Sequence, residues 1–170
     1  MSVDLRPMIP SDAEMLGSWA SDPIFCDHTG WTRRSAVDGA IAWWHEAIAT
    51  PDPDLIRLTV VRDDEPVGYV DLHGSAPDTR ELGFVIGPSA RWGNGLGSAA
   101  AHAGLAYGFE VIGLSVVWAE AVQSNTASMR ILQKIGMNDA GPGCEEEFLG
   151  IMSRYSRFSL TRDEWSRGRR

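Results

Sequence analysis

The chain has 170 residues, of which 44% are hydrophobic and 22% charged, and this balance predicts one soluble globular domain over residues 1–170. Its 15 basic and 23 acidic residues give a net charge of −8, which argues against a nucleic-acid surface and suits a cationic partner such as an amine. Cys26 and Cys144 are too few for a disulfide framework and lack zinc-ligand spacing, and neither a signal peptide nor a membrane span is expected. We therefore expect a cytoplasmic protein without a metal, with homodimerisation left open.

The predicted elements combine strands and helices without an internal repeat. The strands share runs of β-branched and apolar residues between turn signals, and they are predicted at 3–6, 56–61, 67–72, 79–86, 115–122, 147–149 and 155–160. The helices share capping residues ahead of an apolar face, and they are predicted at 11–19, 35–48, 98–109, 124–135 and, briefly, after Thr161.

Local details of this pattern depend on capping and turn residues. Ser11 stands at the start of a capping box and is expected to cap the first helix. Residues 22–32 are expected to be irregular, because they include a proline and a glycine. Residues 141–143 read Gly-Pro-Gly and are expected to turn the chain between the last strands, whereas Gly136 is placed to end the helix before them.

Residues 92–98 read Trp-Gly-Asn-Gly-Leu-Gly-Ser and lie between a predicted strand and a predicted helix. Glycines at alternate positions remove side chains from one face of the turn and allow backbone angles that other residues avoid. Such a loop at a helix N-terminus presents free N–H groups and the positive end of the helix dipole. The pattern predicts an anion site, most often for phosphate, although a lone glycine triplet is equally compatible with a plain tight turn.

Two familiar phosphate loops do not match this stretch. A P-loop needs a lysine and a hydroxyl after its last glycine, but Gly97 is followed by Ser98 and alanines. A dinucleotide fingerprint has the spacing G-x-G-x-x-G near the start of its domain, whereas these glycines follow G-x-G-x-G past the middle of the chain.

The chain resembles the GNAT N-acetyltransferases over nearly its whole length. The family motif Q/R-x-x-G-x-G/A falls on residues 92–97, where Trp92 replaces the usual Gln or Arg. That replacement is typical of the subgroup similar to the ribosomal-protein N-terminal acetyltransferases of the RimJ/RimL type. Further matching stretches lie in family order at 5–7, 81–84, 107–109, 125–128, 132–137 and 155–160.

This resemblance implies an α/β (α+β) fold with a mixed, mostly antiparallel sheet of six to seven strands, splayed at the coenzyme A site and flanked by helices. It implies transfer of an acetyl group from acetyl-CoA to a primary amine by direct attack through a tetrahedral intermediate. The residues that it assigns to the cofactor are Phe84, Val85, Ile86, Trp92, Gly93, Asn94, Gly95, Leu96, Gly97, Ser98 and Asn125. For Asn125, a helix N-cap is an alternative that is compatible with binding.

The resemblance also bears on the acid of the reaction. Many family members carry a tyrosine seven positions after the residue that matches Asn125, but Leu132 stands there. Ser128 lies on the same helix face as Asn125 and matches the serine of the RimJ/RimL type, so it is the candidate donor to the departing thiolate. A thiol pKa of about 8.5 means that a weak donor suffices, and a solvent-facing helix serine is the alternative.

Glu81 is the candidate base, because family glutamates near this strand often work through water; a surface carboxylate is the alternative. Asp71, His73 and Glu120 are its rivals near strand ends. A peptide α-amine costs only about 1.1 kcal/mol to deprotonate at pH 7 against about 4.6 for a lysine, so a site without an evident strong base suits an α-amine better.

The acceptor surface is expected over residues 22–44 and near 141–143. Asp27, His28 and Trp31 are the candidate substrate residues, since acid and aromatic faces together can hold a cation, whereas Trp44 is expected in the core. A protein N-terminus and a small amine stay open as acceptors. A catalytically weak CoA-binding module and an unrelated phosphate-binding enzyme are the alternative functions.

Overall fold

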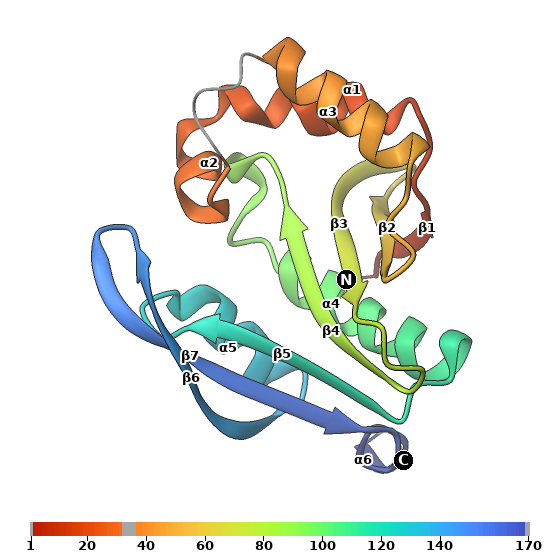
Figure 1. The fold of residues 1–170 in the computed structure, drawn as a ribbon, viewed down its shortest axis with the longest axis vertical. Helices are drawn as coiled ribbons and strands as arrows, with labels where there is room; N and C mark the ends of the chain where they lie inside the picture. The colour runs from red at the N-terminus through yellow and green to blue at the C-terminus, as the bar shows by residue number, and fades with distance from the viewer. Residues whose placement is uncertain (1, 32–36, 169–170) are drawn as a thin grey trace.

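A computed structural model describes residues 2–31 and 37–168 of the chain, and it shows one seven-stranded sheet flanked by helices (Figure 1). The strands are β1 Asp4–Pro7, β2 Leu55–Arg62, β3 Glu65–His73, β4 Thr79–Ile86, β5 Val116–Val122, β6 Asn138–Phe148 and β7 Ile151–Thr161. The helices are α1 Asp12–Ser18, α2 Pro23–Thr29, α3 Val37–Ala49, α4 Leu96–Ala106, α5 Thr126–Lys134 and α6 Arg162–Gly168, with a π-helical turn over Tyr107–Ile112. None of the helices described in these two ranges is long and apolar enough to cross a membrane.

The sheet divides where its only parallel neighbours among the described strands meet. The strand order is β1-β2-β3-β4-β5-β7-β6, and every adjacent pair is antiparallel except β4 and β5. These two strands pair only through Thr79–Glu81 on β4 and Val116–Trp118 on β5. Beyond those residues they diverge and leave a gap between the two halves of the sheet (Figure 1).

The two faces of the sheet pack into two different hydrophobic clusters, because side chains along a strand alternate between the faces. On β3, Val70 packs with Leu82 and with Leu105 of α4, whereas the neighbouring Tyr69 belongs to a cluster with Leu16 of α1 and Trp44 of α3. The α4 helix therefore covers one face, and α1 with α3 covers the other, because successive strand residues point to opposite faces. The expected core position of Trp44 is confirmed, since the residue is 2% exposed.

The segment 22–32 was expected to be irregular, and this prediction is wrong for its first part, which forms α2. The carboxylate of Asp22 accepts hydrogen bonds from the N–H groups of Ile24 and Phe25, both at 3.1 Å, and so caps the helix. Pro23 occupies the first turn, where its missing N–H costs nothing, and Gly30 ends the helix with φ of +70°.

Two further local predictions are corrected. The Ser11 side chain does not cap α1; instead the next residue, Asp12, is buried and accepts from the guanidinium of Arg6 at 2.7 Å and the hydroxyl of Thr59 at 2.8 Å. Residues 141–143 do not turn the chain but lie within β6, where register shifts absorb them. The hairpin turns instead at Leu149 and Gly150.

The strand predicted at 147–149 is too short, because β6 already begins at Asn138, whereas the remaining strands and helices follow the prediction within a few residues. Residues 35 and 36, at the start of the helix predicted at 35–48, lie outside the described residues. Gly136 follows α5 with φ of +86°, as expected of a residue that ends a helix.

Candidate functional site

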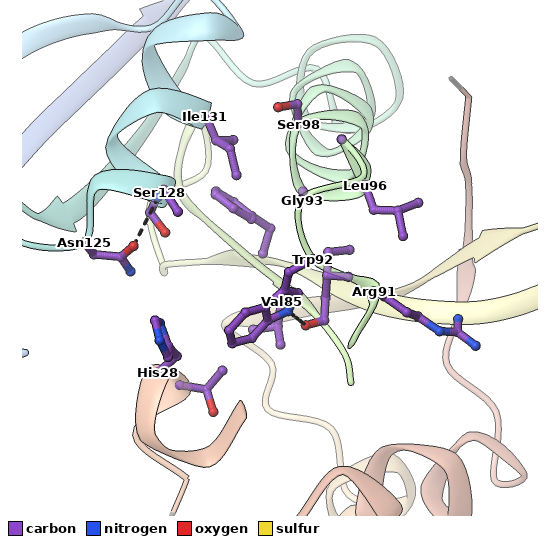
Figure 2. A pocket seen from close by; sticks show the side chains of 16 residues that line it. His28, Val85, Arg91, Trp92, Gly93, Leu96, Ser98, Asn125, Ser128 and Ile131 are labelled. Atoms are coloured by element: carbon purple, nitrogen blue, oxygen red, sulfur yellow. Dashed lines mark hydrogen bonds between the residues drawn. The ribbon is translucent and has the colours of Figure 1, made fainter. Parts of the chain in front are cut away.

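A cleft of about 450 Å³ opens where the end of β4, the glycine-rich loop and the N-terminus of α5 converge (Figure 2). Most of the residues assigned to the cofactor from the sequence line it: Phe84, Val85, Ile86, Trp92, Gly93, Gly95, Leu96, Gly97, Ser98 and Asn125. Asn94 is not among the lining residues, and its side-chain amide donates to the carbonyl oxygens of Arg91 and Trp92, each at 3.3 Å. The loop therefore folds against itself at Asn94 and presents its glycines to the cleft.

The loop backbone needs glycine at two positions. Gly93 and Gly95 both have φ of +78°, a left-handed conformation that L side chains rarely adopt, and no atom lies within 4 Å of a Cβ built on either. Gly95 is the N-cap of α4 and lines the cleft, so the first turn of this helix and its positive dipole end lie at the cleft. This arrangement can hold an anion.

Gly97 has a different role, which is to let α4 approach α5. A Cβ at this position would lie 2.8 Å from Cδ1 of Ile131 and 3.9 Å from the ring of Phe84. Ile131 lines the cleft from α5, so the missing side chain of Gly97 sets the width of the cleft between the two helices.

Trp92 ties the loop to the end of β4. Its indole Nε1 donates to the carbonyl oxygen of Ile86 at 2.7 Å, and its ring packs among both core clusters. The start of the loop is therefore fixed beside the strand by both a hydrogen bond and aromatic packing. A Gln or Arg at this position would not supply the aromatic surface.

Asn125 and Ser128 face the cleft from α5. The Asn125 side-chain oxygen accepts a hydrogen bond from the Ser128 N–H at 3.2 Å, so the expected N-cap is confirmed. The side-chain amide nitrogen of Asn125 points away from Ser128 (Figure 2). The Ser128 side chain lines the cleft one turn into the helix. Leu132, which occupies the position of the family tyrosine, is 1% exposed and belongs to the core.

Glu81 lies outside the cleft lining, at the point where β4 and β5 part. It is half-buried, opposite His73 on β3 and Trp118 on β5. Burial and the charge of Glu120 raise its pKa, and the charges of His73 and Arg157 partly oppose that rise. Arg157 donates to Glu120 at 3.2 Å. The carboxylates of Glu81 and Glu120 thus influence each other electrostatically and lie beside the splay, where β4 and β5 part.

The candidate acceptor residues occupy different environments. His28 lines the cleft and touches Trp92, with ring centroids 4.9 Å apart, but Asp27 and Trp31 are not among the lining residues. Trp31 packs edge-on against Phe25 at 5.0 Å and is partly buried. Sequence reasoning did not single out the remaining lining residues, which are Thr29, Arg91, Ala127 and Ile131.

A second hollow of about 580 Å³ shares Gly95 and Ser98 with the cleft and continues along the outer side of α4. His102 and Lys134 line it, so basic side chains lie in the hollow that adjoins the glycine-rich loop. Across residues 2–31 and 37–168, no group of three or more His, Cys, Asp or Glu side chains is placed to hold a metal ion.

Comparison with known proteins agrees with this geometry. Residues 2–138 match the model of the acetyltransferase (GNAT) domain family. An uncharacterized N-acetyltransferase, YoaA of Bacillus subtilis, is 30% identical over 142 residues, which cover 81% of this chain and 80% of that protein.

Solved structures show the same fold. Spermidine N-acetyltransferase from Vibrio cholerae, solved in complex with CoA and spermine, superposes with a TM-score of 0.80 at 16% identity and covers 97% of this chain and 98% of its own. Aminoglycoside acetyltransferase AAC(6')-Ib, solved with coenzyme A, gives 0.78 at 19% identity and covers 99% and 100%. The expected α/β (α+β) fold, with a mixed seven-stranded sheet flanked by helices, is confirmed.

Proposed function

The chain belongs to the acetyltransferase (GNAT) domain family, and on that premise we propose that it transfers the acetyl group of acetyl-CoA to a primary amine. The observation that carries the proposal is the cleft itself, where the glycine-rich loop, the end of β4 and the first turn of α5 meet at the splay. A catalytically weak CoA-binding module of the same fold is the alternative.

The residues of the cleft fit coenzyme A. Side chains at Gly93 and Gly95 would fill the space in front of the α4 N-terminus, where a pyrophosphate would accept hydrogen bonds from backbone N–H groups. Lys134 and His102 line the adjoining hollow, where they could bind the phosphate group of CoA that is not part of its pyrophosphate. Phe84, Val85 and Ile86 offer strand backbone to its pantetheine arm, and Asn125 lies across the opening from them.

Bound acetyl-CoA supplies the reactive thioester, and the residues around it divide the remaining work. We assign Glu81 as the base that takes the proton of the amine, directly or through water, because its raised pKa suits proton transfer nearer neutral pH. A backbone N–H of β4 at the splay would stabilise the oxyanion. Ser128 would donate a hydrogen bond to the thiolate that leaves as the acyl group passes to the amine nitrogen.

The acceptor class is proposed on narrower grounds. Trp92 at the head of the loop and Ser128 on α5 favour the RimJ/RimL-like subgroup and thus a protein N-terminal α-amine. The structural neighbours named for spermidine and aminoglycosides favour a small amine. Both acceptors are cationic before deprotonation, and the carboxylates of Glu81 and Glu120 beside the splay suit either one. We place the reaction in the cytoplasm, in keeping with a chain that has only two cysteines, Cys26 and Cys144.

Thiol release from acetyl-CoA, measured over a panel of peptides and small amines, tests this function. We expect turnover with at least one acceptor class. CoA binding without turnover would favour the regulatory module, and an absence of CoA binding would overturn the proposal.

A pair of glycine variants tests the cofactor site directly. Gly95→Glu places a side chain and a negative charge in front of the α4 N-terminus, and we expect it to abolish CoA binding in calorimetry. Gly150→Glu is the matched control, because Gly150 has nearly the same φ, +79°, equally open surroundings and a place at the β6–β7 turn. Equal CoA affinity in the two variants would contradict the assignment.

The role of Ser128 has its own test. Ser128→Ala keeps the backbone N–H that Asn125 caps, so we expect unchanged CoA affinity and a kcat lowered roughly tenfold. Ser128→Thr retains a hydroxyl and should keep most of the rate. A kcat unchanged in Ser128→Ala would remove the serine from the reaction.

A further inference from the structure

The gap between β4 and β5 is closed at its far end by a chain of aromatic contacts. His28, on the last turn of α2, touches Trp92 on one side, with ring centroids 4.9 Å apart and planes at 68°. On its other side it touches Phe148 at the end of β6, with centroids 5.4 Å apart and planes at 80°. Both contacts are edge-to-face arrangements of the kind that aromatic rings favour.

These contacts complete a ring of structure around the gap. Trp92 is tied to the end of β4 through the carbonyl oxygen of Ile86. Phe148 pairs with Ile151 in the β6–β7 hairpin, and the part of β7 from Tyr155 to Thr161 pairs in turn with β5. The hairpin extends past the sheet and its tip lies next to α2 (Figure 1). A path thus runs from β4 through Trp92, His28 and the hairpin back to β5.

His28 and Trp92 are the members of this ring that line the cleft. His28 lines it together with Asn125 and Ser128, and Figure 2 shows its imidazole next to the Trp92 indole, near Asn125. The carboxylates of Glu81 and Glu120 lie beside the splay, where β4 and β5 begin to part. The ring therefore joins the cleft lining to the strands on both sides of the gap, and the two carboxylates lie where that gap begins.

The helix that carries His28 is fixed at its other end. The Asp22 carboxylate accepts from the Ser89 N–H at 2.7 Å as well as capping α2, and Phe25 is fully buried. The position of the His28 ring is thus set by α2, whereas the His28 side chain itself is exposed. The imidazole of His28 therefore has a defined place in the cleft lining, near Asn125.

We infer that His28, supported by Phe148, sets the width of the opening through which the acceptor amine reaches the thioester, and so selects unhindered amines over branched ones. The inference rests on the proposed acetyl transfer. It makes His28 a specificity-determining residue and gives it no part in moving protons.

The test compares kcat/KM for two isomeric amines, n-butylamine and sec-butylamine, and for two peptides that begin with glycine or alanine. The wild type should prefer the unbranched member of each pair. His28→Ala and Phe148→Ala should each shift the ratio toward the branched member by roughly tenfold or more, the size typical of discrimination by one methylene or methyl group. His28→Phe should keep the ratio near that of the wild type.

Two features of the design keep the outcomes distinct. Any change in affinity for acetyl-CoA affects both amines alike and cancels in the ratio. His45→Ala, on the exposed side of α3, is the matched control and should leave the ratio unchanged. An unchanged ratio in both His28→Ala and Phe148→Ala, with turnover intact, would overturn this inference alone. An absence of turnover in the wild type with every amine would overturn the proposed function and this inference with it.

Discussion

The indole Nε1 of Trp92 donates to the carbonyl oxygen of Ile86 at 2.7 Å and so joins the glycine-rich loop to the strand that precedes it. Trp92→Phe keeps an aromatic ring but leaves this carbonyl, on a residue that is only 7% exposed, without its donor. We expect the free energy of unfolding to fall by about 1 kcal/mol and CoA affinity to weaken several-fold. Chemical denaturation and calorimetry would measure the two effects, and Trp43→Phe on the exposed side of α3 is the control.

Because α4 lies close to α5 at Gly97, we predict that a second substitution restores the CoA binding that a substitution of Gly97 weakens. In Gly97→Ala the new methyl group would meet Cδ1 of Ile131 at 2.8 Å, which forces that side chain into the cleft or the helices apart. We expect weaker CoA binding, and we expect Ile131→Val to restore it in the double variant, because valine lacks the Cδ1 atom. A double-mutant cycle on CoA affinity measures the coupling. Additive effects of the two substitutions would contradict this account of the cleft width.

We predict that neutralising Glu120 and neutralising Arg157 shift the pH profile of kcat/KM in opposite directions. A base works when ionised, so kcat/KM should fall as pH drops through the pKa of Glu81. Burial and the negative charge of Glu120 raise that pKa, and the positive charge of Arg157 lowers it. Glu120→Gln should therefore move the acidic limb of the profile to lower pH, and Arg157→Gln should move it to higher pH.

The profile has a simple control. Asp38→Asn, on the exposed start of α3, should leave the acidic limb in place. If Glu120→Gln and Arg157→Gln shift the limb in the same direction, the group that titrates is not Glu81.

The buried carboxylate of Asp12 predicts loss of stability in acid. Burial alone raises the pKa of Asp12, but hydrogen bonds from Arg6, the Ile9 N–H and Thr59 outweigh it and lower the pKa below its usual value. A lowered folded-state pKa stabilises the fold above the unfolded-state pKa, and this contribution is lost as pH falls through the folded value. Asp12→Ala should cost about 3 kcal/mol at neutral pH.

The free energy of unfolding, measured as a function of pH, separates the effect of the charge of Asp12 from that of its side-chain shape. Asp12→Asn keeps the shape of the side chain, so its stability should depend less on pH below 5 than that of the wild type. Asp4→Asn, on an exposed residue of β1, is the control for charge alone. An equal pH dependence in Asp12→Asn and the wild type would contradict the assigned role.

Local signals in the sequence predicted where the cleft lies and most of the residues that line it. The spacing of the glycines fixed the place of the loop, and Asn125 was recognisable as an N-cap because an Asx residue stood ahead of an apolar helix face. The helix α2 was missed although Asp22 and Pro23 form a favourable helix start and Gly30 a favourable end. The proline and glycine were read as breakers, whereas they stand at the helix boundaries.

Other features depend on contacts between distant parts of the chain. Pro142 is tolerated within β6 because that strand is at the edge of the sheet and its ladder shifts register around it. The buried pairing of Asp12 with Thr59 joins α1 to β2 across much of the chain. The contact of His28 with Phe148 joins α2 to the last hairpin. No local pattern contains such pairs, so periodicity and capping signals could not predict them.

The divergence of β4 from β5 gives this sheet an edge in its interior. Exposed strand edges invite pairing with other chains, and proteins usually shorten, charge or cover them. Here the diverging stretch of β4 lies between the two halves of one sheet, with α5, the glycine-rich loop and α2 around it. A slender, extended ligand, such as the pantetheine arm proposed above, would fit along this strand, whereas the edge of a second folded sheet would have to pass the surrounding elements. On the proposed function, the same backbone would thus be open to a ligand and shielded from pairing with another chain.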